Sequence, residues 1–201
     1  LYAPVCDVGA KAFPERCYGD RREIVIELSK QWILGALSCD GIDRVCLKHA
    51  PGHGVSINSG NENSQDTHNN LCFSDDNLSV IREHMNVFTE VIQGAQQEGV
   101  AVDAIRVMTN HILYRELDSK YPVSSSSKAI SYIQEHLPEG IKLIADCVNM
   151  ASFADSRASF IKNLDQACRM HEGGVIATTH FVKTLGRKEM LKQMEIAQGL
   201  V

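Results

Sequence analysis

The stretch Arg44–Gly54, RVCLKHAPGHG, joins an apolar segment typical of a buried strand to a polar loop. Its first residues, RVCL, form the apolar run expected of a strand in a sheet core. The remainder, KHAPGHG, places a lysine and histidines among residues that shape the backbone. Pro51 fixes its own φ, and Gly52 and Gly54 permit conformations closed to other residues. Such a loop aims backbone and side chains at a ligand, or else forms an ordinary turn.

Short apolar runs of this kind recur along the chain. Besides RVCL they are Tyr2–Val8, Ala104–Met108, Ile141–Ala145 and Val175–Thr178. Stretches with helical spacing of apolar residues separate them, and strands that alternate with helices favour a parallel sheet with helical crossovers. About five strands are too few for a complete eight-stranded β/α barrel, which needs about 250 residues. The pattern predicts a doubly wound open sheet if the chain is complete, or a barrel if part of it is missing.

Two of the predicted helices carry an apolar stripe that we expect to face the core. In the helix at 22–37 the stripe is Ile24, Leu28, Trp32 and Ala36. In the helix around 81–95 it is Ile81, Met85, Phe88, Ile92 and Ala95. Further helices are predicted at 128–136, 154–171 and 182–198. A long polar loop is predicted at 50–76.

Composition and charge limit the class of protein. The chain has 201 residues and a net charge of −5, typical of one globular domain and unlike a nucleic-acid binder. The longest uncharged apolar-rich run, Trp32–Cys39, is far shorter than the roughly 18 residues needed to span a bilayer. Seven cysteines without a CxxC pair favour a reducing, cytoplasmic setting. Because the chain begins with Leu1, we expect a piece of a longer protein.

Ionisable side chains lie at the ends of four predicted strands. They are Asp7, Lys48 with His49, His111, and Asp146. In a β/α barrel the carboxyl ends of the strands surround the active site. A polar strand end is also simply where a buried strand meets solvent. His111 in particular could line a pocket or satisfy backbone groups, and the sequence leaves both options open.

A second group of interest is Asp66-Thr67-His68. A carboxylate two residues before an imidazole can hold the ring and raise its basicity, and histidine can serve as general acid and general base. The loop histidines His49, His53 and His68 could instead bind zinc. Against zinc, the HExxH motif is absent, and the nearest histidines lie on a Pro/Gly loop rather than a helix. The motifs GxGxxG, GxxxxGK[ST] and GxSxG are absent as well.

Taken together, KHAPGHG, DTH and LIADCVNM resemble motifs of the family three glycoside hydrolases, and most closely those of its bacterial exo-β-N-acetylglucosaminidases of cell-wall recycling. The segments LYAPVCDV, ERCYGD and MTNHILYRELD also resemble family segments in the same order. The resemblance runs from Leu1 to about Met150. It implies a TIM-type β/α barrel that is incomplete, because the family's N-terminal strands have no counterpart here. It also implies that residues 1–201 form part of a single catalytic domain, completed by a missing N-terminal segment or a second chain.

The resemblance further implies a retaining β-N-acetylhexosaminidase acting on terminal β-linked N-acetylglucosamine of muropeptides or similar glycosides. Asp146 would be the nucleophile that forms a covalent glycosyl intermediate. His68, paired with Asp66, would be the general acid and base. Three further residues would bind sugar hydroxyls: Arg16, Lys48 and His49. Neither a metal nor another cofactor is implied. The division of roles agrees with the need of a retaining glycosidase for a carboxylate on one side of the anomeric carbon and a proton shuttle on the other.

Each role has a simpler alternative. Asp146 could cap a helix, and His68 could be a solvated loop residue. Lys48 could be a surface charge, and Arg16 could pair with Glu15 or Asp20. The segment 55–65 is roughly seven residues longer than the family's connection, a length that costs little closure entropy but could displace His68. A catalytically inactive relative that binds sugar or a partner is therefore the main alternative function, and a metal hydrolase is the third.

Overall fold

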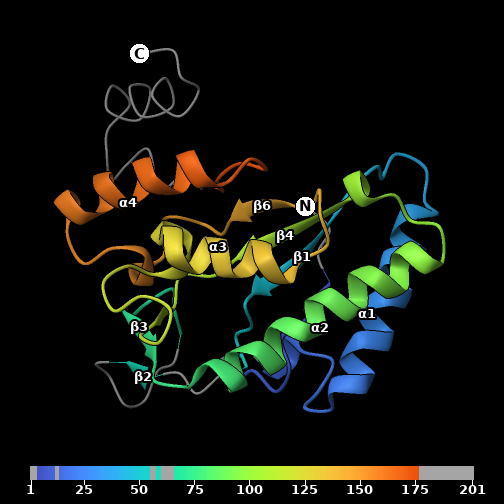
Figure 1. The fold of residues 1–201 in the computed structure, drawn as a ribbon, viewed down its shortest axis with the longest axis horizontal. Coiled ribbons are helices and arrows are strands. Elements are labelled where there is room, and N and C mark those ends of the chain that lie inside the picture. Colours follow the sequence, from blue (N-terminus) through green and yellow to red (C-terminus); the bar gives the residue numbers. More distant parts are fainter. Residues whose placement is uncertain (1–3, 12–13, 55–57, 60–65, 177–201) are drawn as a thin grey trace.

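A parallel sheet forms the centre of the fold. The computed structural model describes residues 4–11, 14–54, 58–59 and 66–176 (Figure 1). The sheet has the spatial order β1-β4-β6, and these strands are Val45–Ala50, Ile105–Thr109 and Lys142–Ala145. Single parallel bridges continue it on both sides, where Val5 pairs with Lys48 and Val175 pairs with Ala145. Three of the predicted strands therefore form one parallel sheet, and the described parts of the other two add one bridge each, which confirms the α/β class.

Helices connect these strands. The α-helices are α1 (Arg22–Leu37), α2 (Leu78–Gln97), α3 (Ser127–His136) and α4 (Arg157–Met170). Short 3-10 helices lie at Pro14–Arg16 (η1), Val102–Ala104 (η2), Val123–Ser125 (η3) and Ala151–Phe153 (η4). Helices α1, α2 and α3 share one core with strand side chains, which are Val45, Leu47, Ile105, Val107 and Leu143. Figure 1 shows α1 and α2 lying along each other beside the sheet. The chain therefore repeats a unit in which a helix connects two parallel strands.

The opposite face of the sheet carries a smaller apolar cluster. It consists of Cys46, Met108 and Ile144, with Ile176 packed against them. Successive side chains of a strand point to opposite faces, so these residues alternate with those that contact the helices. In a β/α barrel this second face is the barrel interior. Burial raises the pKa of the Cys46 thiol to about 12, which keeps it protonated.

Two strands of a second, small sheet lie within the segment 50–76 that was predicted to be a polar loop. The sheet has the order β2-β3-β5, formed by Asn58–Ser59, Cys72–Ser74 and Leu113–Tyr114. β2 and β3 are antiparallel, whereas β3 and β5 are parallel. The prediction of an unbroken loop over 50–76 was therefore wrong, and β1 itself continues through Ala50. The cause is that β3 is short and is stabilised by a partner strand far along the chain.

The two predicted helix stripes had opposite outcomes. In α2 every predicted residue is fully buried, which confirms that stripe. In α1 the prediction was wrong for Ile24 and Leu28, which are exposed, whereas Trp32 and Ala36 pack partly buried against the core. The fully buried residues of α1 are instead Val25, Ser29 and Ile33. Helix α1 is apolar on more than one face, so a spacing of four residues did not single out the buried one. The last predicted helix, 182–198, lies outside the described residues. Among the described helices, none is both long and apolar enough to cross a membrane.

Candidate active site

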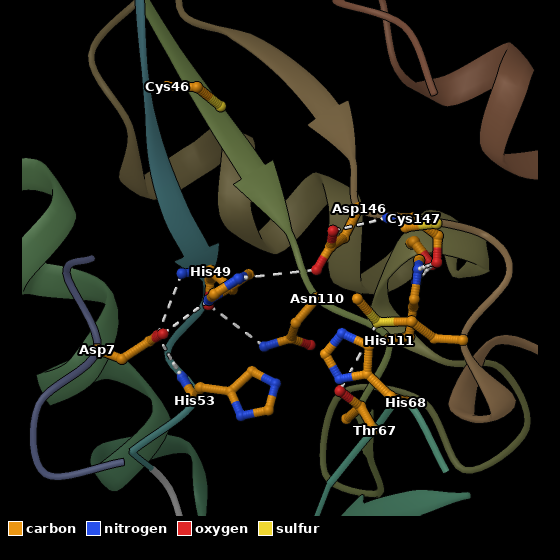
Figure 2. A network of polar contacts seen from close by, with 12 residues as sticks. Asp7, Cys46, His49, His53, Thr67, His68, Asn110, His111, Asp146 and Cys147 are labelled. Carbon is orange, nitrogen blue, oxygen red and sulfur yellow. Dashed lines mark hydrogen bonds and ion pairs between the residues drawn. The ribbon is translucent and has the colours of Figure 1, made fainter. Parts of the chain in front are cut away.

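Polar side chains gather at the carboxyl ends of the parallel strands (Figure 2). Asp7 follows the bridge at Val5, His49 lies near the end of β1, and Asp146 directly follows β6. Asn110 and His111 directly follow β4. Because parallel strands end at the same edge of a sheet, residues far apart in the sequence meet there. The structure therefore brings together the strand-end residues that the sequence singled out.

Asp7 holds the start of the loop after β1. Its Oδ2 lies 2.7 Å from His49 Nδ1, and its Oδ1 accepts the backbone N–H groups of His49 and His53 at 3.1 and 2.7 Å. Burial raises the pKa of Asp7, but the adjacent His49 and His53 outweigh this and lower it to about 2. Asp7 is therefore ionised near neutral pH and fixes the orientation of the His49 ring.

Asp146 presents its two carboxylate oxygens to different partners. Oδ1 accepts the backbone N–H of Cys147 at 2.7 Å, and Oδ2 lies 3.7 Å from His49 Nε2. Figure 2 shows His49 and Asp146 pointing toward one another. The alternative role of Asp146 as a helix cap was wrong, since α4 begins at Arg157 behind the capping residue Ser156. Asp146 is thus a nearly buried carboxylate with a defined direction.

The PGHG part of the loop is packed too tightly for larger residues. A Cβ atom on Gly52 would lie 2.7 Å from His84 Cβ, and one on Gly54 would lie 1.7 Å from the carbonyl oxygen of Val8. Tyr114 Oη donates a hydrogen bond to the Gly52 carbonyl oxygen at 2.9 Å. The loop is therefore a fixed platform, and its glycines are required by close approach.

His53 lies inside this platform. Its ring meets the His49 ring edge-on, with 5.4 Å between centroids. Burial lowers the pKa of His53 to about 4, against the raising effect of the nearby Asp7 charge. The ring is thus neutral at neutral pH, which suits a structural role in this loop.

The Asp66–His68 turn faces the same region from another loop. Asp66 Oδ1 lies 2.7 Å from His68 Nδ1 and also accepts the His68 backbone N–H at 2.9 Å. Burial raises the pKa of Asp66, but hydrogen bonds from the backbone and ring of His68 outweigh this and hold it below its ordinary value. His68 is half-exposed, yet its ring is fixed by Asp66, so it is not a freely solvated residue.

This turn is attached to the loop that follows Asp146. The backbone N–H groups of Ala151 and Ser152 donate to the carbonyl oxygens of His68 and Thr67 at 3.1 and 3.0 Å. The Asp66–His68 turn and the loop after β6 therefore form one assembly.

Two further residues, Lys48 and Arg16, were predicted to bind sugar. Lys48 is half-buried near the end of β1, and its charge affects the titration of Cys46, as does that of Asp146. Arg16 is exposed at the end of η1. Their roles in binding stay predictions. Within the described ranges, no three His, Cys, Asp or Glu side chains are grouped so that they could hold a metal ion.

Sequence reasoning missed residues that connect the loops. Asn110 Nδ2 donates to the His49 carbonyl oxygen and to Tyr114 Oη, and its Oδ1 accepts the N–H of Ile112. Ser152 Oγ donates to the His111 carbonyl oxygen at 2.8 Å. The position of Asn110 directly after β4 was the one signal that could have marked it. Nothing local distinguishes Ser152.

A parallel β/α sheet with carboxylate and imidazole groups at its carboxyl ends is typical of α/β enzymes, the TIM-type barrels among them. More narrowly, the chain belongs to glycosyl hydrolase family 3, because the model of that family's N-terminal domain matches residues 1–175. The resemblance to this family found in the sequence is thereby confirmed. No curated protein sequence matches the chain significantly.

Solved structures agree with the family assignment. M. tuberculosis LpqI superimposes with a TM-score of 0.72 at 19% identity, over 100% of this chain and 55% of its own. Zinc-bound CbsA from Thermotoga neapolitana superimposes with a TM-score of 0.71 at 21% identity, over 97% of this chain and 39% of CbsA. NagZ from Neisseria gonorrhoeae, in complex with N-trifluoroacetyl-D-glucosamine, superimposes with a TM-score of 0.64 at 19% identity, over 98% of this chain and 55% of NagZ. These likenesses establish the TIM-type fold rather than a doubly wound sheet. The chain spans about two fifths to just over half of those structures' length.

Proposed function

We propose that the protein is a retaining β-N-acetylhexosaminidase that removes terminal β-linked N-acetylglucosamine. The observation that carries the proposal is the position of Asp146, a strand-end carboxylate aligned by Cys147 and His49. The turn that holds the Asp66–His68 pair is hydrogen-bonded to the loop that follows Asp146. A retaining glycosidase needs a nucleophilic carboxylate and a separate proton shuttle. Family membership supports the reaction class.

In the first step, the ionised Asp146 attacks the anomeric carbon while the glycosidic bond breaks. His68 gives its Nε2 proton to the leaving oxygen, because its Nδ1–H is held by Asp66. In the second step, His68 takes a proton from water, and the resulting nucleophile displaces Asp146 from the sugar. Atoms balance, because the proton lost in the first step is regained in the second. Bringing reacting groups into such alignment supplies much of an enzyme's rate enhancement.

Three residues are assigned to sugar binding. His49, Lys48 and Arg16 carry donors able to bind hydroxyl groups, and the His49 ring is already oriented by Asp7. The N-acetylglucosamine preference is supported by the solved relatives, which include a β-N-acetylglucosaminidase from Thermotoga maritima and NagZ bound to an N-acylated glucosamine. Muropeptide substrates, a part in peptidoglycan recycling and a cytoplasmic location stay predictions from the sequence.

The test is release of 4-nitrophenol from 4-nitrophenyl N-acetyl-β-D-glucosaminide near neutral pH, with this chain and with its longest natural form. We expect Asp146→Asn to lower kcat by at least about 1000-fold, equivalent to about 4 kcal/mol in the barrier. Asp165→Asn, on the surface of α4, is the matched control and should retain activity. A slow 5-fluoro glycosyl substrate should label Asp146, as seen by peptide mass spectrometry. A folded natural form that binds N-acetylglucosamine without turnover would instead identify an inactive sugar-binding relative.

A further inference from the structure

The His111 ring is enclosed in the protein and uses both of its nitrogens. The residue is 1% exposed. Its Nε2 lies 3.0 Å from the carbonyl oxygen of Cys147, and its Nδ1 lies 2.6 Å from Ser124 Oγ. A carbonyl oxygen can only accept, so Nε2 carries the hydrogen and Nδ1 accepts from the Ser124 hydroxyl. The surroundings thus select one neutral tautomer.

The main chain of Cys147 connects the His111 ring to the Asp146 carboxylate. Its carbonyl oxygen accepts from His111, while its backbone N–H donates to Asp146 Oδ1 at 2.7 Å. The backbone N–H of Asp146 is in turn bound to the Thr109 carbonyl oxygen at 3.1 Å. The residue that supports the Asp146 carboxylate is therefore held at its other end by the His111 ring.

We propose that His111 is a positioning residue for Asp146, acting through the main chain of Cys147, with the Ser124 hydroxyl holding the ring at Nδ1. The proposal rests on the proposed hydrolase function. Because the ring is buried and both nitrogens are engaged within the protein, His111 does not contact the substrate. Its effect is on the orientation of the nucleophile, and a displacement of about 1 Å near a reacting group can cost about 100-fold in rate.

The backbone of His111 reaches the acid–base turn as well. Its carbonyl oxygen accepts a hydrogen bond from Ser152 Oγ, and the Ser152 backbone N–H donates to Thr67. Ser152 Oγ also accepts the N–H of Cys72 at 3.0 Å. His111 is therefore connected on one side to Asp146 and on the other side to the turn that carries Asp66 and His68. Its edge-on contact with Phe153, at 5.0 Å between centroids, fixes the ring from the side.

Two substitutions of His111 separate positioning from packing. A glutamine amide reaches the position of Nε2 and can still donate to Cys147, whereas an asparagine amide reaches only the position of Nδ1. On the 4-nitrophenyl substrate, in the longest natural form, we expect His111→Asn to lower kcat about 100-fold with KM within about threefold. His111→Gln should retain kcat within about fivefold of the unsubstituted protein. His136→Asn, a histidine on α3 bonded to the Tyr132 carbonyl oxygen, is the matched control and should leave kcat unchanged.

Equal losses in His111→Asn and His111→Gln, or an unchanged kcat in a folded His111→Asn protein, would overturn the proposal. If both variants fail to fold, Ser124→Ala provides a second route, because it removes the hydrogen bond that holds the ring at Nδ1 and leaves that buried nitrogen without a donor. That variant should lower kcat and not KM, and an unchanged kcat would count against the proposal.

Nitrogen-15 NMR of the ring separates this proposal from the hydrolase assignment, because it needs no turnover. In the unsubstituted protein Nε2 should be protonated and Nδ1 unprotonated. The Cys147 amide proton should report the ionisation of Asp146, an effect lost in His111→Asn and kept in His111→Gln. If turnover is absent but these signals appear, the hydrolase function fails while the positioning link stands. A protonated Nδ1 would overturn the link whatever the activity.

Discussion

The site contains two carboxylate–imidazole pairs with the same 2.7 Å contact in opposite surroundings. In the buried pair, the side chains of Asp7 and His49 are 3% and 13% exposed. In the exposed pair, those of Asp66 and His68 are 25% and 44% exposed. The Asp7 carboxylate also accepts backbone N–H groups of two residues in the loop after β1, whereas the exposed pair lies on a turn.

The difference teaches that one chemical pair serves two purposes. The buried pair fixes where strand ends and loop lie, because breaking it would leave buried donors unsatisfied. The exposed pair can exchange protons with substrate and water without such a penalty. We therefore expect the buried pair to determine stability and the exposed pair to determine proton transfer.

The strongest test of this contrast is His68→Ala against His49→Ala. His68→Ala should lower kcat about 100- to 10,000-fold, the usual contribution of a general acid or base. The unfolding free energy should change by less than about 0.5 kcal/mol, as for other surface changes. Comparing 2,4-dinitrophenyl with 4-nitrophenyl glycosides checks the role, because the better leaving group needs less protonation and should lose less rate. His49→Ala should reduce both activity and stability, and an unstable His68→Ala protein would break the distinction.

The next largest effect should be the difference in unfolding free energy between two matched variants, Asp7→Ala and Asp66→Ala, measured by urea unfolding at pH 7. Asp7→Ala leaves the N–H groups of His49 and His53 without their acceptor, and should cost about 2–5 kcal/mol. Asp66→Ala affects a partly solvated turn and should cost less than about 1 kcal/mol. Similar losses in both variants would mean that burial does not separate the pairs.

Acid should weaken the buried region through His53. Its folded-state pKa of about 4 lies below the ordinary value of 6.5, so the unfolded chain binds the proton more readily. The resulting stability is fully present above pH 6.5 and is lost as pH falls toward 4, by at most about 3 kcal/mol. Urea midpoints from pH 7 to 4.5 should fall accordingly. His53→Gln should flatten that dependence, and an unchanged slope would contradict the assignment.

The smallest expected effect is that of Asn69→Ala in the exposed turn. Asn69 Nδ2 donates to Asp66 Oδ2 at 2.7 Å, but the contact is exposed to water. We expect kcat to fall about twofold, in keeping with a net hydrogen-bond contribution of about 0.5 kcal/mol. Asn110→Ala, at a buried asparagine bonded to His49 and Tyr114, is the comparison and should reduce both stability and kcat more strongly.

Much of the fold could be predicted from local patterns. Apolar runs that end in polar residues identified the strands, and the strand ends then located Asp7, His49 and Asp146. The acid–base pair was visible because Asp66 and His68 are two residues apart. Family resemblance supplied the roles, which no spacing could have given.

The remainder depends on contacts between distant parts of the chain. The strand at Cys72–Ser74 exists because it pairs with Leu113–Tyr114, and that partner has no local signal. The buried face of α1 is decided by what packs against it, and not by its own apolar pattern. The functions of Ser124 and Ser152 arise from hydrogen bonds to loops that are remote in sequence.

The attachment of the Asp66–His68 turn bears on how such a chain tolerates substitutions. Thr67 and His68 are tied to Ala151 and Ser152 through main-chain atoms alone, so the tie does not depend on which side chains are present. The tie therefore holds the Asp66–His68 turn, and with it the proton donor that we propose, against the loop after β6. Substitutions of the side chains at these four positions should leave the turn in place as long as the backbone keeps its course.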